Sequence, residues 1–110
     1  MKARDFIQDG ECVIVVFTTG HKLEINKDHS GFTGNWPIDP HNKIDRVIIY
    51  YRNELAGKNN VFLATFEEAV LSDDKERYEL RLSHIQYAGE TVLNWYEFAD
   101  TGPNPIRYLP

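Results

Sequence analysis

Two Asn–Trp pairs, Asn35–Trp36 and Asn94–Trp95, are the residues best suited to hold a flat ligand. An indole offers a broad face on which a nucleobase can stack, and an asparagine amide can both donate to and accept from the edge of a base. The alternative for both tryptophans is structural. Trp36 would then plug one end of the fold, and Trp95 would pack its own segment onto a sheet.

The segment around Trp36, GFTGNWPIDP, holds two glycines and two prolines. Because glycine and proline favour turns, we expect residues 27–44 to be mostly loop. Loops lie on the surface and carry binding residues more often than scaffold residues do. Pro37 would stiffen this loop and so reduce the entropy lost on binding. We therefore expect Trp36 to form one wall of the main ligand pocket.

Tyrosine and arginine side chains could complete such a site. Tyr50 could contribute a hydroxyl group, and Arg46, Arg52 and Arg81 could hold phosphates. The formal net charge of −5 sets a condition on this hypothesis, because nucleic-acid binding requires basic residues to neutralise phosphates. Scattered basic residues would favour a protein partner instead. Nucleic-acid binding requires six of them to gather around the aromatic loop: Arg46, Arg52, Lys58, Arg77, Arg81 and Arg107.

Motifs of known catalytic sites are mostly absent. The chain has no glycine-rich phosphate loop and no G-x-S-x-G elbow. Cys12 opens a strongly apolar run, where a thiol is usually inert packing. The nearest enzyme alternative is a metal-dependent nuclease built on Asp45 or Glu67 with the ELR triplet at 79–81, although that triplet carries arginine where lysine is needed. We expect no catalytic activity.

Metal and cofactor sites are also not expected. No two of the four histidines have the spacing of a helical or strand-borne metal site. A site built from the loop that carries two of them remains geometrically possible. The histidines are His21, His29, His41 and His84.

Hydrophobic patterning predicts a mostly-β (α+β) fold. We expect a small antiparallel β-barrel or curled sheet with one or two short helices. Residues 12–18 and 21–26 are interpreted as a hairpin. Residues 77–87 alternate between apolar and polar until the parity changes at His84–Ile85, which predicts a β-bulge. Further strands are expected at 45–51, 61–66 and 106–109. The strand at 61–66 could continue through a bend over residues 67–71.

Two segments are ambiguous. Residues 90–99 suit a short helix or an irregular turn, and the opening residues 3–10 suit a helical turn or an edge strand. The apolar positions of the predicted strands should be largely buried: Ile14, Val16, Val47, Ile49, Leu63, Leu80 and Leu82.

The length of 110 residues corresponds to a single domain, residues 1–110, which could be a recognition domain of a larger protein. One cysteine allows no internal disulfide, and no apolar run is long enough to cross a membrane. The first residues do not form a signal peptide. We expect a cytoplasmic protein with no membrane partner.

The segment GNWPIDPHNKIDRVIIYYR places a tryptophan-bearing loop before Asp45–Arg46 and an apolar strand that ends in two tyrosines. This order resembles the PUA-like barrels, in particular the EVE and ASCH branches, in which such a loop precedes a GD-x-[VI]-x-x-Y strand. The resemblance covers residues 31–87 and departs from the family pattern at Ile44, where the family has glycine. It implies a pocket that accepts a flipped or single nucleobase, often a modified one.

The function expected from the sequence is therefore that of a non-catalytic binding domain. Its partner would be DNA or RNA with a modified or flipped base, held in an aromatic pocket. The competing expectation is a protein–protein interaction module, because acidic charge, exposed aromatic residues and strand edges also suit protein partners.

Overall fold

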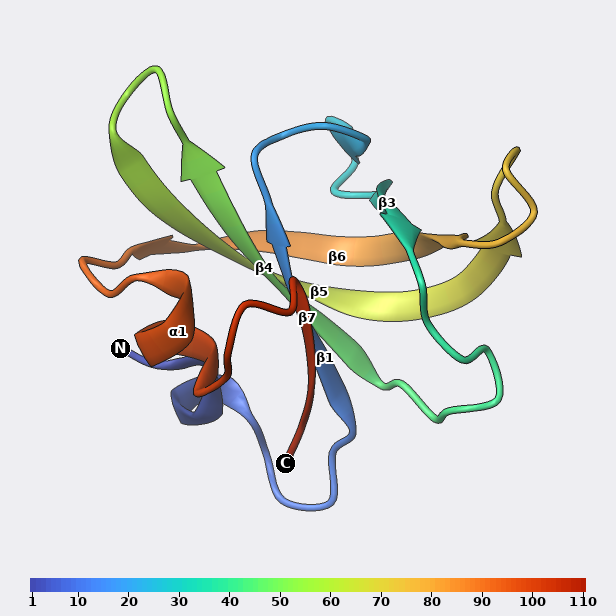
Figure 1. The fold of residues 1–110 in the computed structure, drawn as a ribbon, viewed down its shortest axis with the longest axis horizontal. Helices are drawn as coiled ribbons and strands as arrows, with labels where there is room; N and C mark the ends of the chain where they lie inside the picture. The colour runs from blue at the N-terminus through green and yellow to red at the C-terminus, as the bar shows by residue number, and fades with distance from the viewer.

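One seven-stranded mixed sheet forms the body of the computed structural model, which describes residues 1–110 (Figure 1). The strand order is β2-β3-β6-β5-β4-β1-β7. The strands are β1 (Val13–Thr18), β2 (Leu23–Ile25), β3 (Gly31–Trp36), β4 (Arg46–Asn53), β5 (Lys58–Leu71), β6 (Tyr78–Glu90) and β7 (Ile106–Leu109). A 3-10 turn, η1 (Ala3–Phe6), and one short helix, α1 (Trp95–Ala99), complete the fold. The expected mostly-β composition is confirmed, whereas the sheet is not closed into a barrel.

The central strands correct one predicted pairing and the expectation that the sheet is antiparallel throughout. β1 pairs in parallel with β4, with Val13 opposite Arg46, and antiparallel with β7. The expected hairpin of residues 12–18 with 21–26 is wrong, because β2 pairs with β3 instead. The reason lies in β1 itself, which is buried on both faces from Val13 to Val16. Such a strand needs neighbours along both edges and cover on both faces, as parallel inner strands have.

The two faces of the sheet carry separate hydrophobic cores, as expected for a strand pair that is apolar on both sides. The first core lies on the face of Ile14 and Val16, and the second lies on the face of Val13 and Val15, beneath η1 and α1. Of the residues predicted to be in the core, Leu63 is only partly buried. The others are buried: Ile14, Val16, Val47, Ile49, Leu80 and Leu82.

The predicted β-bulge in β6 is confirmed. Leu63 lies opposite Gln86 and Thr65 opposite Ser83, so β6 has one extra residue over the step. His84 has a positive φ of 50°, and the Ile85 amide donates to the carbonyl of His29 at 2.8 Å. The bulge therefore turns β6 towards the β2–β3 turn.

β3 corrects the expectation that residues 27–44 form a loop. Residues 31–36 form a strand that pairs with β6, and 37–44 contain no helix or strand. Gly31 explains why the turn signal was misleading. A Cβ atom at this position would lie 1.9 Å from the carbonyl oxygen of Glu24, so glycine permits close strand approach here.

The remaining segments follow the predictions. Residues 90–99 contain the short helix α1, which begins at Asn94, where the side chain accepts from the Glu97 amide. Figure 1 shows α1 beside η1 on one side of the sheet. β5 continues through Leu71, and β7 forms the predicted last strand. None of the helices has the length and apolar composition needed to cross a membrane.

Candidate functional site

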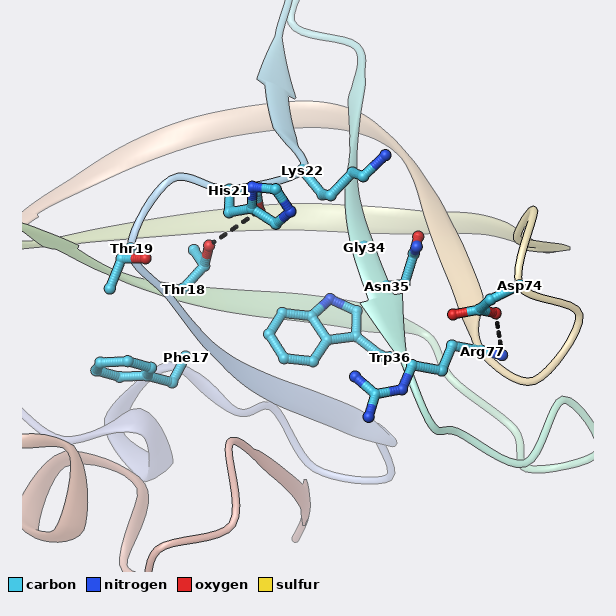
Figure 2. Close-up of a pocket in the computed structure, with 10 residues that line it drawn as sticks. All are labelled: Phe17, Thr18, Thr19, His21, Lys22, Gly34, Asn35, Trp36, Asp74 and Arg77. Carbon is cyan, nitrogen blue, oxygen red and sulfur yellow. Dashed lines mark hydrogen bonds between the residues drawn. The ribbon is translucent and has the colours of Figure 1, made fainter.

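A cavity of about 310 Å³ opens where β1 and β3 end and the β5–β6 turn approaches them (Figure 2). We call it the Trp36 cavity. Its lining comes from three separate parts of the chain: Phe17, Thr18, Thr19, His21, Lys22, Gly34, Asn35, Trp36, Asp74 and Arg77.

Trp36 has both a structural and an exposed part. Its side chain belongs to the first core, its residue is 8% exposed, and its Nε1 donates to the Thr33 hydroxyl at 3.1 Å. Figure 2 shows the indole amid the labelled residues, with Arg77 on one side and His21 on the other. Trp36 therefore packs in the core and also lines the cavity, so its role in binding stays a prediction.

Backbone contacts hold the polar side chains around Trp36. The Gly34 amide donates to the Lys22 carbonyl at 2.9 Å, which fixes the β1–β2 turn beside the end of β3. Lys22 has a left-handed φ of 54°. Tyr78, the first residue of β6, pairs with Trp36, and this pairing places the preceding Arg77 at the cavity. The Gly34–Asn35 peptide bond is cis.

The Trp36 cavity contains two cationic side chains that form no ion pair. Neither Lys22 nor Arg77 forms an ion pair, and both side chains are exposed. The one carboxylate in the lining, Asp74, accepts from the Ser72 hydroxyl at 2.5 Å and from the Arg77 amide at 3.1 Å. Hydrogen bonds, that from Ser72 first, hold the pKa of Asp74 below its usual value. Asp74 therefore stays ionised and organises the turn.

A second cavity, of about 320 Å³, lies on the other side of Phe17, and we call it the Trp95 cavity. It gathers four of the residues that the sequence singled out, and Phe17 lines both cavities. Its lining is Phe17, Tyr50, Arg52, Asn59, Val92, Asn94 and Trp95.

Aromatic rings form one side of the Trp95 cavity. Phe17 stacks on Tyr50 with ring centroids 5.7 Å apart, and Trp95 meets both rings edge-on at the same separation. The polar atoms of these rings are used inside the protein. The Tyr50 hydroxyl donates to the Leu93 carbonyl at 2.7 Å, and Trp95 Nε1 donates to the Asn104 carbonyl at 2.8 Å. Burial raises the pKa of Tyr50.

These bonds alter the roles expected for two residues. The Tyr50 hydroxyl is engaged by the backbone, and Asn94 uses its side-chain oxygen to cap α1 at 2.9 Å. Asn35 lines the Trp36 cavity without a side-chain hydrogen bond, so its amide is available to a ligand. The two Asn–Trp pairs therefore have different surroundings although their sequences are alike.

The three arginines proposed to hold phosphates lie apart. Arg46 pairs with Glu11, with Nε 2.7 Å from Oε2, and also donates to the Phe6 carbonyl. Arg81 pairs with Glu79 at 2.9 Å. Of the three, Arg52 alone lines one of these two cavities, and its guanidinium donates to Asn59 at 3.0 Å.

The basic residues expected to gather around Trp36 are thus mostly elsewhere. Among the six, Arg77 alone lines the Trp36 cavity. Lys22 and His21, which the sequence did not single out, stand there instead, and Phe17 joins the two cavities. The sequence did contain one signal for His21 and Lys22. They follow a Thr-Thr-Gly turn that ends an apolar strand, so they are expected near the end of that strand. The pairing of β3 with β6 that brings Arg77 close leaves no such local signal.

A third cavity, of about 420 Å³, lies at the β6 bulge between His29 and His84. Several of its polar groups are already bonded: the Ser30 hydroxyl donates to Asp28 at 2.6 Å, and His29 Nδ1 lies 3.1 Å from the Ile85 carbonyl. The Ser83 hydroxyl donates to Glu67, outside the lining, at 2.5 Å. Asp45, the other acid of the nuclease alternative, accepts from the Cys12 amide at 2.8 Å. No group of three or more His, Cys, Asp or Glu side chains is placed to hold a metal ion.

Comparisons with family models, with curated proteins and with solved structures gave no match to this chain.

Proposed function

We propose that this domain is a non-catalytic binding module that accepts a single nucleotide unit, with its base out of the stack, in the Trp36 cavity. The observation that carries the proposal is the joining of Trp36 with two unpaired cations, Lys22 and Arg77, at the meeting point of three segments. An aromatic surface and nearby positive charge are what a base with its phosphate requires.

The size and chemistry of the cavity suit one nucleotide. Its volume of about 310 Å³ lies at the lower end of the range for small-ligand sites. Trp36 presents only the exposed part of its ring, so the base would pack on one side against it. The free amide of Asn35 can donate to and accept from the edge of that base. Modified bases that differ at this edge would be distinguished by these hydrogen bonds.

The charge distribution favours a ligand with few phosphates. The chain is acidic overall, yet the Trp36 cavity has two permanent cations and one histidine against a single, internally bonded carboxylate. A long duplex would meet the acidic remainder of the surface. The resemblance to PUA-like domains implies the same class of ligand, although those domains are closed into a barrel.

The cavity also favours binding over chemistry. The Thr18 hydroxyl accepts from the Gly20 amide at 3.0 Å and lies 3.5 Å from the His21 carbonyl. It is therefore bonded to the backbone and not to a side chain that could act as its base.

Strand addition by a protein partner has less support. One free edge of the sheet, β2, has only three residues. The other, β7, has four and lies between Pro105 and Pro110. Short edges and flanking prolines are common ways in which proteins prevent edge pairing.

Equilibrium titration with nucleoside 5′-monophosphates, carrying unmodified or methylated bases, tests the proposal. Lys22→Ala and Arg77→Ala should each weaken binding about tenfold or more, since each removes a charge-assisted hydrogen bond. Lys27→Ala is the matched control, because Lys27 is an exposed lysine in the neighbouring turn that lines neither cavity. Equal binding by all three variants, or no binding by the wild type, would overturn the proposal.

A further inference from the structure

We infer that the ligand is a single-stranded segment of at least two nucleotides, with the neighbouring nucleotide in the Trp95 cavity. This inference rests on the proposed function of the Trp36 cavity. It adds a second subsite and extends the ligand from a single nucleotide unit to a single strand.

Phe17 connects the two cavities at one edge of the sheet. The pairing between β7 and β1 begins at Val16, opposite Ile106, and the Phe17 amide donates to the Pro105 carbonyl at 2.8 Å. Beyond this bond, no strand pairs with Thr18 on the β7 side. Phe17 lines both cavities, so the path from one cavity to the other passes the Phe17 ring at this edge of the sheet.

The Phe17 ring is held rigidly enough to act as a platform. It is only partly buried, and it packs on Tyr50 with an interplanar angle of 24° and on Trp95 at 64°. Side chains that are fixed before binding lose little entropy when a ligand arrives. Successive bases of single strands commonly stack on such aromatic side chains.

Each cavity supplies positive charge for a phosphate. Arg52 lines the Trp95 cavity, is partly exposed, and bonds to the neutral Asn59 instead of a carboxylate. No acidic residue lines this cavity. A strand that crosses Phe17 would therefore meet Lys22 and Arg77 on one side and Arg52 on the other.

The Trp95 cavity has few polar atoms that are free to read the edge of a base. Its aromatic side offers stacking but few free hydrogen-bonding groups, because the Tyr50 hydroxyl, the Trp95 Nε1 and the side-chain oxygen of Asn94 are bonded within the protein. The second subsite would thus accept any base. Recognition of base identity would remain with Asn35 in the Trp36 cavity.

Binding by thymidylate oligonucleotides of one, two and four nucleotides tests this inference. The second nucleotide should raise the affinity at least about fivefold, the lower end of what stacking one base contributes. Arg52→Ala should remove that gain and leave the affinity for the mononucleotide unchanged. It should also reduce the slope of log K against log salt by about 0.7, as expected for one phosphate contact fewer on a single strand. Arg81→Ala, which removes an arginine that lines neither cavity, is the matched control.

The outcomes separate this inference from the proposed function. If the mononucleotide binds through Lys22 and Arg77 and the second nucleotide adds nothing, the second subsite is wrong while the proposed function stands. If the dinucleotide depends on Arg52 alone, the Trp36 cavity is not the site and both proposals fail as stated. If no oligonucleotide binds, both are overturned.

Discussion

The two Asn–Trp pairs consist of the same two residue types but lie in different surroundings. Asn94 caps a helix with its side-chain oxygen, and Trp95 Nε1 donates to a backbone carbonyl, so the fold uses one polar atom of each side chain. Asn35 keeps a free amide, and Trp36 lines a cavity beside unpaired cations. Both tryptophans are equally buried, at 8% exposure. Burial alone therefore does not distinguish a structural tryptophan from a candidate binding one. The distinction comes from whether the neighbouring polar and charged groups are already bonded within the protein.

Truncation of Trp95 should have the largest effect. Trp95→Ala removes a ring that packs on Phe17 and Tyr50 in the second core. We expect the free energy of unfolding to fall by about 3–5 kcal/mol in denaturant titration, which is a large part of the stability of a domain. Tyr96→Ala, at an exposed neighbour, should change it by less than about 0.5 kcal/mol. Similar losses in the two variants would show that Trp95 is not a structural anchor.

Replacement of Trp36 should affect both stability and binding. Trp36→Phe keeps an aromatic ring but removes the donor to Thr33, whose hydroxyl is fully buried. An unpaired buried group costs about 1–3 kcal/mol, so we expect a stability loss of that size. Nucleotide affinity should fall as well, because the smaller ring offers less stacking area. A loss of stability with unchanged affinity of the folded fraction would make Trp36 purely a core residue.

Removal of the Tyr50 hydroxyl should have a smaller effect. In Tyr50→Phe the Leu93 carbonyl loses its 2.7 Å donor but keeps a second donor, the Asn59 amide, at 3.4 Å. We therefore expect a loss of about 0.5–1.5 kcal/mol, measured by denaturant titration. The affinity for a mononucleotide should not change, because this hydroxyl is not free to contact a ligand. A clear loss of affinity would contradict the structural role given to Tyr50.

The sequence predicted local features better than long-range ones. The bulge at His84–Ile85 was visible because a change of parity in one strand is recorded in that strand alone. The parallel pairing of β1 with β4 was not visible. Both strands are apolar on both faces, so their patterns specify neither direction nor partner. β3 was missed because Gly31 was interpreted as a turn residue, whereas glycine at this position permits close approach to Glu24.

The candidate site shows the same limit. Six of the predicted ligand- and phosphate-binding residues line one of the two cavities, whereas the sequence-based prediction placed them in one pocket. Arg46 was a poor choice because Glu11, which neutralises it, comes from a distant segment. Lys22 was not predicted, and Arg77 was predicted only as one of six basic residues. The Tyr78–Trp36 pairing and the Gly34–Lys22 hydrogen bond place both beside Trp36. Whether a charged side chain forms an ion pair depends on the tertiary structure, so sequence patterns alone do not predict it.

The smallest expected effect concerns Asp74, the one carboxylate in the Trp36 cavity. Hydrogen bonds from Ser72, Glu76 and Arg77 keep its pKa below the usual 3.8. A group whose pKa is lower in the folded state stabilises that state above its unfolded pKa, and loses this contribution as the pH falls through its folded pKa. An NMR titration should therefore place the midpoint of the Asp74 carboxyl below 3.8.

Two variants sharpen this last expectation. Asp74→Asn should weaken the acid dependence of stability that arises below pH 4. Asp73→Asn is the matched control, because the donors of the turn bond to the Asp74 carboxylate. The effect is small because the Asp74 carboxylate is fully exposed and water competes for its hydrogen bonds. A midpoint at or above 3.8 would mean that the turn is not held by Asp74. Arg77 would then be positioned at the cavity by its pairing neighbour, Tyr78, alone.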